Sequence, residues 1–315
     1  MATTDEVSRI VGKTPLVHLE AFSNEVGARV YAKYEAANPG GSIKDRAARC
    51  MIDRAEQRGD IVPGKTLVVE PTSGNTGVAL AMIGAARGYE VVLTMPESMS
   101  KERRMLLAAY GAKLVLTPAS EGMAGAVAEA ERIAAQSESA WIPNQFGNPD
   151  NPLAHELSTG PEIVEALGGF PDVVVAGAGT GGTISGTAHY LNKQGASTEF
   201  YAVEPAESPI IGQALAGQPL APAPHGIQGI GANFIPEALD LEVLSGALPI
   251  PTNSAYAEAR LLAQREGLLA GISSGANVAG VRKLVEDRPE LQGKTIVTFV
   301  VDTGERYLST PLFAE

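Results

Sequence analysis

Short apolar runs rich in β-branched residues alternate along the chain with longer segments whose apolar positions recur every three or four residues. The first pattern predicts buried strands, and the second predicts amphipathic helices. The predicted strands cover residues 66–70, 91–95, 113–117, 172–176, 200–204 and 295–301. The predicted helices cover residues 42–57, 75–87, 101–110, 123–136, 183–193, 254–266 and 276–287. This alternation is typical of βαβ units, so we expect an α/β protein with parallel sheets.

Residues 144–152, a segment dense in Asn and Pro, divide the chain roughly in half and are the best candidate for a domain boundary. Each half contains its own strand–helix alternation. Because α/β proteins bind ligands in crevices beside the ends of their strands, we expect a ligand to sit in a cleft between the two halves.

Composition and charge exclude several classes of function. The 315 residues are 44% hydrophobic and 19% charged, and the formal net charge of −12 disfavours nucleic acid as a partner. With Cys50 as the single cysteine and four scattered histidines, we expect no disulfide framework and no metal site. The acidic N-terminus does not resemble a signal peptide, and no apolar stretch reaches the ~20 residues of a membrane helix. We therefore expect a cytoplasmic protein without membrane association.

Two familiar patterns occur in the wrong context. Residues 59–66 match the P-loop pattern, but they follow a predicted helix and precede a predicted strand, whereas a P-loop requires the opposite order. Residues 271–275 match Gly-x-Ser-x-Gly, yet the last histidine, His225, precedes Ser273, so the Ser–acid–His order of α/β-hydrolases cannot be completed. We expect neither a P-loop nucleotide site nor a Ser–His–Asp hydrolase.

A glycine-rich turn at residues 177–182 reads Gly-Ala-Gly-Thr-Gly-Gly and lies between a predicted strand and a predicted helix. Backbone N–H groups at the start of a helix bind anions, so this turn predicts a phosphate site. The turn also matches Gly-x-Gly-x-x-Gly, and Glu204 follows at about the spacing of twenty residues found in dinucleotide-binding folds. On this pattern alone, a nicotinamide-dependent oxidoreductase is an alternative.

A second glycine-rich segment, residues 38–46, reads Asn-Pro-Gly-Gly-Ser-Ile-Lys-Asp-Arg and leads into a predicted helix. Ser42 and Asp45 have the spacing of a capping box, which places Lys44 in the first helical turn. The helix dipole opposes a positive charge there and favours the neutral amine that Schiff-base chemistry requires. Lys44 is therefore a candidate catalytic residue, with an ordinary solvated lysine as the alternative.

A third segment, residues 70–77, reads Glu-Pro-Thr-Ser-Gly-Asn-Thr-Gly and again joins a strand to a helix. Its hydroxyl and amide side chains cluster at helix N-terminal N–H groups, which predicts either a neutral cradle for a carboxylate or an ordinary N-cap. The chain thus offers two anion sites and one activated lysine. A phosphate-bearing aldehyde cofactor together with an amino-acid carboxylate would use all three.

These segments resemble those of the fold-type II pyridoxal-phosphate enzymes, and among them the A-type O-acetylserine sulfhydrylases of the cysteine synthase/cystathionine β-synthase family. Residues 145–149, 159–162, 227–231 and 304–310 also fit, so the similarity extends from residue 12 to residue 313, with departures at Asn233 and Thr303. The resemblance implies two three-layer α/β/α domains with mostly parallel sheets and an active site in the cleft between them. The smaller domain would cover residues 36–148, and the larger one residues 1–35 and 149–315.

The resemblance also implies roles for individual residues. Lys44 would hold pyridoxal 5'-phosphate as an internal aldimine and later remove the substrate α-proton. Asn75 would bind the ring hydroxyl of the cofactor, and Ser273 would face its pyridine nitrogen. The phosphate would bind at Gly179, Thr180, Gly181, Gly182 and Thr183. The substrate carboxylate would bind at Thr72, Ser73, Thr76 and Gln145, and Gly229 lies on the loop lining the amino-acid site.

The implied reaction is a β-replacement in which O-acetyl-L-serine and sulfide give L-cysteine and acetate through an α-aminoacrylate intermediate. A neutral Ser273 hydroxyl cannot stabilise a protonated pyridinium as a carboxylate would, which favours β-elimination. O-phosphoserine sulfhydrylase and cystathionine β-synthase-like β-replacement are the alternatives within this fold. The resemblance further implies a homodimer, and it makes the C-terminal tail of serine acetyltransferase a candidate partner.

Overall fold

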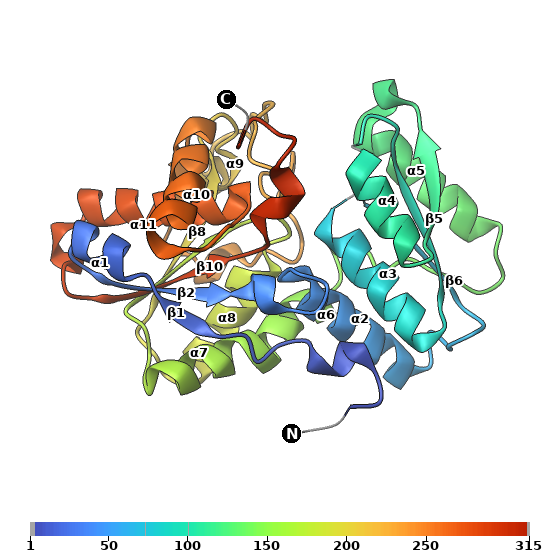
Figure 1. The fold of residues 1–315 in the computed structure, drawn as a ribbon, viewed down its shortest axis with the longest axis horizontal. Coiled ribbons are helices and arrows are strands. Elements are labelled where there is room, and N and C mark those ends of the chain that lie inside the picture. Colours follow the sequence, from blue (N-terminus) through green and yellow to red (C-terminus); the bar gives the residue numbers. More distant parts are fainter. Residues whose placement is uncertain (1–3, 73, 100, 314–315) are drawn as a thin grey trace. The chain divides into compact units, whose positions relative to one another are not determined.

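In the computed structural model, which describes residues 4–72, 74–99 and 101–313, the chain forms two compact units (Figure 1). The smaller unit contains residues 1–12 and 38–150, and the larger unit contains residues 13–37 and 151–315. The chain passes between the units within two residues of the boundaries expected at 36 and 148, but its first twelve residues group with the smaller unit. Hydrogen bonds hold them there: Gly12 N–H donates to Asn38 Oδ1, Arg49 donates to the Val11 carbonyl, and Arg87 donates to the side chains of Glu6 and Ser8.

In the described residues, the smaller unit has a four-stranded parallel sheet in the order β5-β4-β3-β6. Its strands are β3 (Leu67–Pro71), β4 (Glu90–Pro96), β5 (Lys113–Thr117) and β6 (Ala140–Trp141). Its helices are α2 (Lys44–Arg58), α3 (Asn75–Arg87), α4 (Lys101–Ala109) and α5 (Gly122–Ala135). Successive strand residues face opposite sides, so Val68 and Leu93 pack with α2, α3 and α4, whereas Val69 and Val92 pack with Ala130 of α5.

The larger unit, over the part of the chain that the structure describes, has a six-stranded sheet in the order β1-β2-β10-β7-β8-β9. Only β1 runs antiparallel to its neighbour in this sheet. The strands are β1 (Leu16–His18), β2 (Arg29–Tyr34), β7 (Val173–Gly177), β8 (Glu199–Pro205), β9 (Gly246–Ile250) and β10 (Thr295–Val300). The helices are α1 (Glu20–Val26), α7 (Gly160–Leu167), α8 (Gly182–Lys193), α9 (Ile210–Leu215), α10 (Thr252–Glu266) and α11 (Ile272–Asp287). A short helix, α6 (Asp150–Ala154), runs into a π-helical turn at His155–Thr159.

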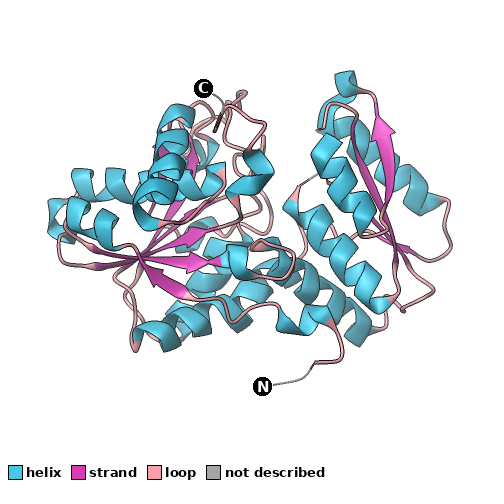
Figure 2. Ribbon diagram, viewed as in Figure 1, coloured by secondary structure: helices cyan, strands magenta, loops and turns pink. Residues whose placement is uncertain are grey.

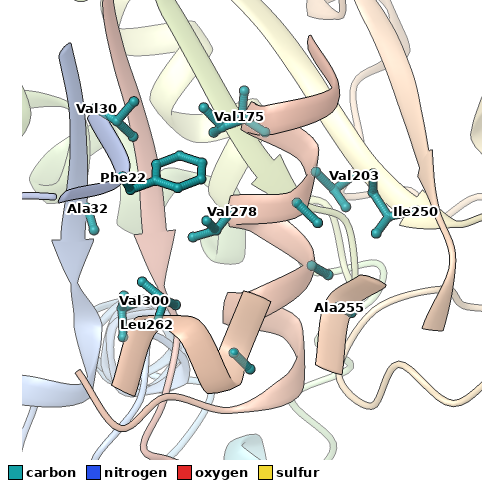
Figure 3. Packing of buried hydrophobic residues seen from close by; sticks show 14 of the residues in the cluster. Phe22, Val30, Ala32, Val175, Val203, Ile250, Ala255, Leu262, Val278 and Val300 are labelled. Atoms are coloured by element: carbon teal, nitrogen blue, oxygen red, sulfur yellow. The ribbon is translucent and has the colours of Figure 1, made fainter. Parts of the chain in front are cut away.

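Helices cover both faces of the sheet in the larger unit. Helices α1, α10 and α11 lie on one face, and α7 and α8 lie on the other (Figures 1 and 2). On the first face, Phe22 of α1 and Val278 of α11 pack against Val30 of β2 and Val175 of β7 (Figure 3). The expected fold class, two three-layer α/β/α domains with mostly parallel sheets, is therefore confirmed.

Every strand and helix predicted from the sequence is present, and the largest shift is at the last helix. This helix was predicted to begin at residue 276, but it begins at Ile272, so Ser273 lies in its first turn. The strands β1, β2, β6 and β9 and the helices α1, α6, α7 and α9 were not predicted. Strand β2 was not predicted because the charge of Lys33 interrupts its apolar pattern. In the structure the Lys33 side chain is 1% exposed, and its Nζ forms an ion pair with Glu162 Oε2 at 2.7 Å.

No helix formed by the described residues is long and apolar enough to cross a membrane. Those residues also form no group of three or more His, Cys, Asp or Glu side chains that could hold a metal ion. Burial, with smaller contributions from Asp150 and Asp53, raises the pKa of the Cys50 thiol to about 12. The thiol of Cys50 is therefore uncharged and a poor nucleophile at neutral pH.

The close packing of α10 on α11 can be tested at Gly275. A Cβ at this position would collide with the Ala255 carbonyl oxygen and would lie 2.6 Å from the Ala259 nitrogen, and neither backbone atom can rotate away. We expect Gly275→Ala to lower the free energy of unfolding by about 1–3 kcal/mol in urea denaturation followed by circular dichroism. Gly169→Ala is the control, since a Cβ there has no described neighbour within 4 Å. Equal losses in the two variants would contradict the packing argument.

Candidate active site

Lys44 is the first residue of α2 and follows a tight turn. The buried Asp45 carboxylate accepts a hydrogen bond from the backbone N–H of Gly40 at 2.6 Å, and Lys44 N–H donates to Ser42 Oγ at 3.2 Å. The N-cap residue is Ile43 rather than Ser42, so the helix begins one residue later than the predicted capping box implies. A Cβ at Gly40 would lie 2.5 Å from an Asp45 carboxylate oxygen, so a larger residue there would displace this carboxylate from the turn. The turn fixes the backbone that carries the half-buried Lys44 side chain.

The second predicted segment joins β3 to α3. Thr72 is buried, and its Oγ1 accepts a hydrogen bond from Gly74 N–H at 3.3 Å. Asn75 begins α3, and Thr76 in the same turn donates its hydroxyl proton to Gln145 Oε1 at 2.6 Å. The structure therefore brings Thr76 and Gln145 together beside the end of β3, with Thr72 on the adjoining loop. The predicted site residue Ser73 lies outside the described residues.

Glu70, which the sequence motifs did not single out as a functional residue, joins the end of β3 to the segment that contains Asn144 and Gln145. Its side chain is 1% exposed, and its carboxylate accepts hydrogen bonds from Asn144 N–H at 3.1 Å and Gln145 N–H at 3.4 Å. Asn144 has a φ of 51°, a left-handed conformation that few residues other than glycine adopt. Burial raises the pKa of Glu70 to about 7, although both N–H groups favour the ionised form. Glu70 thus holds the backbone that presents Gln145, and its one signal in the sequence is a carboxylate in an otherwise apolar strand.

The glycine-rich turn follows β7 in the larger unit and leads into α8. Its N-cap residue, Gly181, has a φ of 82° and no side chain with which to cap the helix. A Cβ at Gly179 would collide with the Gly229 carbonyl oxygen, and a Cβ at Gly182 would collide with Asn151. The glycines therefore permit close packing, and the N-cap residue supplies no side chain to the first N–H groups of α8, as is typical of an anion site.

Ser273 and Gly229 lie next to each other in the same unit. Ser273 is 3% exposed, and a Cβ at Gly229, whose φ is 97°, would lie 3.6 Å from the Ser273 hydroxyl oxygen. Within the described part of the chain, this hydroxyl makes no hydrogen bond. It can therefore donate to or accept from a ligand atom.

The dinucleotide pattern does not develop into a nucleotide site. Glu204, the acidic residue at the spacing of a dinucleotide-binding fold, is 1% exposed and accepts hydrogen bonds from Ile211 N–H at 2.7 Å and Gly212 N–H at 3.0 Å. It therefore binds the first turn of α9 instead of a ribose, and burial raises its pKa. The P-loop pattern at residues 59–66 lies between α2 and β3, the order that argued against it.

Pyridoxal phosphate, the cofactor implied by the sequence, fits the groups found in each unit. The turn at residues 177–183 contains no cationic side chain and offers a phosphate the N–H groups at the positive end of the α8 dipole, together with the hydroxyls of Thr180 and Thr183. Ser273 offers a hydroxyl suited to a ring nitrogen. In the smaller unit, Lys44 offers an amine suited to an aldehyde, and Asn75 offers an amide at the start of α3.

Comparison with known proteins gives consistent matches over nearly the whole chain. The family model described as "Pyridoxal-phosphate dependent enzyme" matches residues 7–302. The chain is 51% identical over 314 residues to cysteine synthase A of Escherichia coli strain K12, covering 99% of this chain and 96% of that protein. It is 47% identical over 312 residues to a cysteine synthase of Staphylococcus aureus strain Mu50, covering 98% and 97%. The crystal structure of cysteine synthase from Entamoeba histolytica has a TM-score of 0.92 at 40% identity, covering 99% of this chain and 91% of that one.

The buried carboxylate of Glu70 predicts a pH dependence of stability. Folding raises its pKa from 4.5 to about 7, so between these pH values the native state holds a proton that the unfolded state has lost. This group therefore makes the free energy of unfolding fall as the pH rises through that window, with no further fall above it.

Urea denaturation of the wild type and Glu70→Gln across this pH window tests the prediction. We expect a shallower decline in the variant, because its side chain does not ionise. Comparing slopes removes the pH-independent effect of the substitution. Parallel slopes would contradict the raised pKa.

Proposed function

The chain belongs to the family of pyridoxal-phosphate-dependent enzymes, and from this premise we propose that it converts O-acetyl-L-serine and sulfide into L-cysteine and acetate. One observation carries the proposal. A lysine at a helix start, a neutral carboxylate cradle and a glycine-rich phosphate turn occur together in a chain similar to cysteine synthases over nearly its full length. Bound pyridoxal 5'-phosphate supplies the carbonyl that reacts with amines and the electron sink that acidifies the substrate α-carbon.

Lys44 carries the covalent and proton-transfer chemistry in this proposal. Its Nζ binds the cofactor, and its place in the first turn of α2 disfavours the charged ammonium form, which is not nucleophilic. The free Lys44 amine would also be the base that accepts the α-proton of the substrate. The turn held by Asp45 and Gly40 fixes the backbone from which this side chain reaches.

The carboxylate of the amino-acid substrate binds in the cradle of the smaller unit, through Thr72, Ser73, Thr76 and Gln145. The hydrogen bond from Thr76 to Gln145 joins the two segments of this cradle, and Glu70 supports the second segment from its buried position. Neutral donors bind a carboxylate without a buried ion pair, whose desolvation would be costly.

The remaining site residues bind the cofactor. Gly179, Thr180, Gly181, Gly182 and Thr183 bind the phosphate, Asn75 binds the ring hydroxyl, and Ser273 binds the pyridine nitrogen. Gly229 lines the amino-acid site, where its lack of a side chain leaves room beside Ser273. These assignments are supported by the lack of an N-cap side chain at α8 and by the Ser273 hydroxyl, which has no hydrogen-bond partner in the described part of the chain.

O-phosphoserine, as in an O-phosphoserine sulfhydrylase, or serine, as in cystathionine β-synthase-like β-replacement, is the second candidate for the donor substrate. A phosphate leaving group carries more negative charge than acetate and favours a nearby cation. Residues 70–77 and 144–147, which form the cradle, contain no Lys or Arg. This composition favours O-acetylserine.

We further propose a cytoplasmic homodimer. A carboxylate cradle can also take the C-terminal carboxylate of a peptide, which makes the tail of serine acetyltransferase a candidate ligand of the same cradle. A competition assay between such a peptide and O-acetylserine tests this partner.

Removal of the Lys44 amine should abolish turnover. We expect Lys44→Ala to lose cysteine formation to the background of the assay, because both the covalent attachment and the base for the α-proton disappear. The measurement is cysteine production from O-acetylserine and sulfide, with circular dichroism showing that the variant folds. A folded Lys44→Ala enzyme with wild-type turnover would refute the assignment.

A visible absorbance spectrum tests the cofactor and the donor substrate together. We expect a yellow protein whose band moves to longer wavelength with O-acetylserine and returns when sulfide is added. A shift with O-phosphoserine alone, or with serine and homocysteine alone, would keep the cofactor and change the substrate. A protein that stays colourless when supplied with pyridoxal phosphate would refute the proposal.

A further inference from the structure

The phosphate turn contacts a buried polar segment to which the proposed function gives no role, namely Asn151 and the π-helical turn His155–Thr159. Helix α8 packs closely on this segment, because a Cβ at Gly186 would collide with the Pro152 carbonyl oxygen and lie 2.9 Å from His155 Cβ. Asn151 and His155 are each 2% exposed, and Thr159 is fully buried. Buried polar side chains have defined hydrogen-bond partners, and those of this segment include both threonines of the phosphate turn.

Asn151 sets the direction of the Thr180 hydroxyl. Its Nδ2 donates to Thr180 Oγ1 at 2.9 Å, and Gly182 N–H donates to the same oxygen at 3.4 Å. An N–H group can only donate, so the Thr180 oxygen accepts both bonds. The hydroxyl proton of Thr180 is therefore directed toward a third group.

His155 can set the direction of the Thr183 hydroxyl in a similar way. Its Nε2 lies 3.3 Å from Thr183 Oγ1, and its Nδ1 lies 2.9 Å from Thr159 Oγ1. A neutral imidazole has one N–H and one lone pair, so this chain of hydrogen bonds runs in one of two directions.

The two directions differ in what Thr183 presents to a ligand. With the proton on Nε2, Thr159 donates to Nδ1, Thr183 accepts from Nε2, and the Thr183 proton is available to an anion. With the proton on Nδ1, Thr183 donates to Nε2 and presents only lone pairs, which an anion repels.

We propose that Asn151 and His155 are positioning residues that hold the Thr180 and Thr183 hydroxyls as donors to the cofactor phosphate, with His155 as the neutral Nε2–H tautomer. The identity of the anion rests on the proposed function. Residues 177–183 contain no cationic side chain, so the N–H and O–H donors of this turn stabilise the phosphate charge. The direction of each hydroxyl proton therefore affects the affinity for the phosphate. A hydrogen bond to a charged acceptor corresponds to about ten- to hundredfold in affinity.

The tautomer of His155 can be observed directly. In the holoenzyme with ¹⁵N-labelled histidine, the two ring nitrogens give a pattern of chemical shifts that distinguishes the tautomers, and the signals of His155 are those lost in His155→Gln. We expect the neutral Nε2–H form. An Nδ1–H or doubly protonated ring in the holoenzyme would overturn the proposal.

Ligand affinity of the apoprotein gives an independent test. Pyridoxal 5'-phosphate is compared with pyridoxal, which lacks the phosphate. We expect Asn151→Leu and His155→Phe each to weaken binding of the phosphorylated form about ten- to hundredfold, with little change for pyridoxal. Thr159→Val keeps the imidazole and removes only the hydroxyl that donates to Nδ1, so we expect an about two- to tenfold loss. This variant carries the test if the larger changes prevent folding.

Thr187→Val is the matched control. Thr187 lies one turn beyond Thr183 on α8, is fully buried, and has a hydroxyl with no hydrogen-bond partner among the described residues. Its removal should leave both affinities unchanged. The proposal is overturned if folded Thr159→Val and Asn151→Leu bind pyridoxal 5'-phosphate like the wild type, or lose both ligands equally. A wild type that binds the cofactor but makes no cysteine would contradict the proposed function and leave this test intact.

Discussion

The first N–H groups of a helix have no acceptor inside that helix, and this constraint determines how the candidate site is built. Helices α3, α8 and α11 begin after Gly74, Gly181 and Gly271, which have no side chain to satisfy those groups. A Cβ at Gly74 would have no neighbour within 4 Å, whereas a Cβ at Gly181 would collide with Leu239 and one at Gly271 with the Asp302 carboxylate, so close packing excludes a capping side chain at α8 and α11. The N-cap residue of α8 therefore supplies no side chain to the first N–H groups of that helix, and the proposed function assigns these groups to the cofactor phosphate.

Three buried acidic side chains serve a different purpose, which is to hold the backbone in place. Asp45, Glu70 and Glu204 are buried, and each accepts backbone N–H groups of a neighbouring turn or helix start. The chain has a net charge of −12, but these three carboxylates form hydrogen bonds with backbone N–H groups of the protein. The groups assigned to ligands are neutral hydroxyls, amides and N–H groups. This division keeps negative charge away from the proposed phosphate and carboxylate ligands, while Asp45 and Glu70 hold the backbone next to Lys44 and Gln145.

The sequence was sufficient to predict those strands, helices and turns whose pattern lies within one short segment of the chain. Parallel strands buried on both faces have unbroken apolar runs, and the turns at residues 38–46, 70–77 and 177–182 each stand between a strand-like and a helix-like pattern, or lead into a helix. Strand β2 was not predicted because it contains the charged residue Lys33. The ion pair that allows Lys33 to be buried is formed with Glu162, a residue far along the chain. Sequence pattern cannot show that a charge of this kind is buried.

Contacts between residues distant in sequence also decide which site residues could be predicted. Lys44 was derived from its local segment, whereas Gln145, Gly229 and Ser273 depended on resemblance to a family, because their partners are distant in sequence. Glu70 and His155 received no role from either route. Glu70 contacts a backbone 74 residues away, and His155 contacts a hydroxyl 28 residues away. A neutral Ser273 then completes the argument for the chemistry. In the proposed role, Ser273 would bond to the pyridine nitrogen without supplying the negative charge that keeps this nitrogen protonated, and the proposed site would favour rapid departure of a good leaving group over a long-lived carbanion.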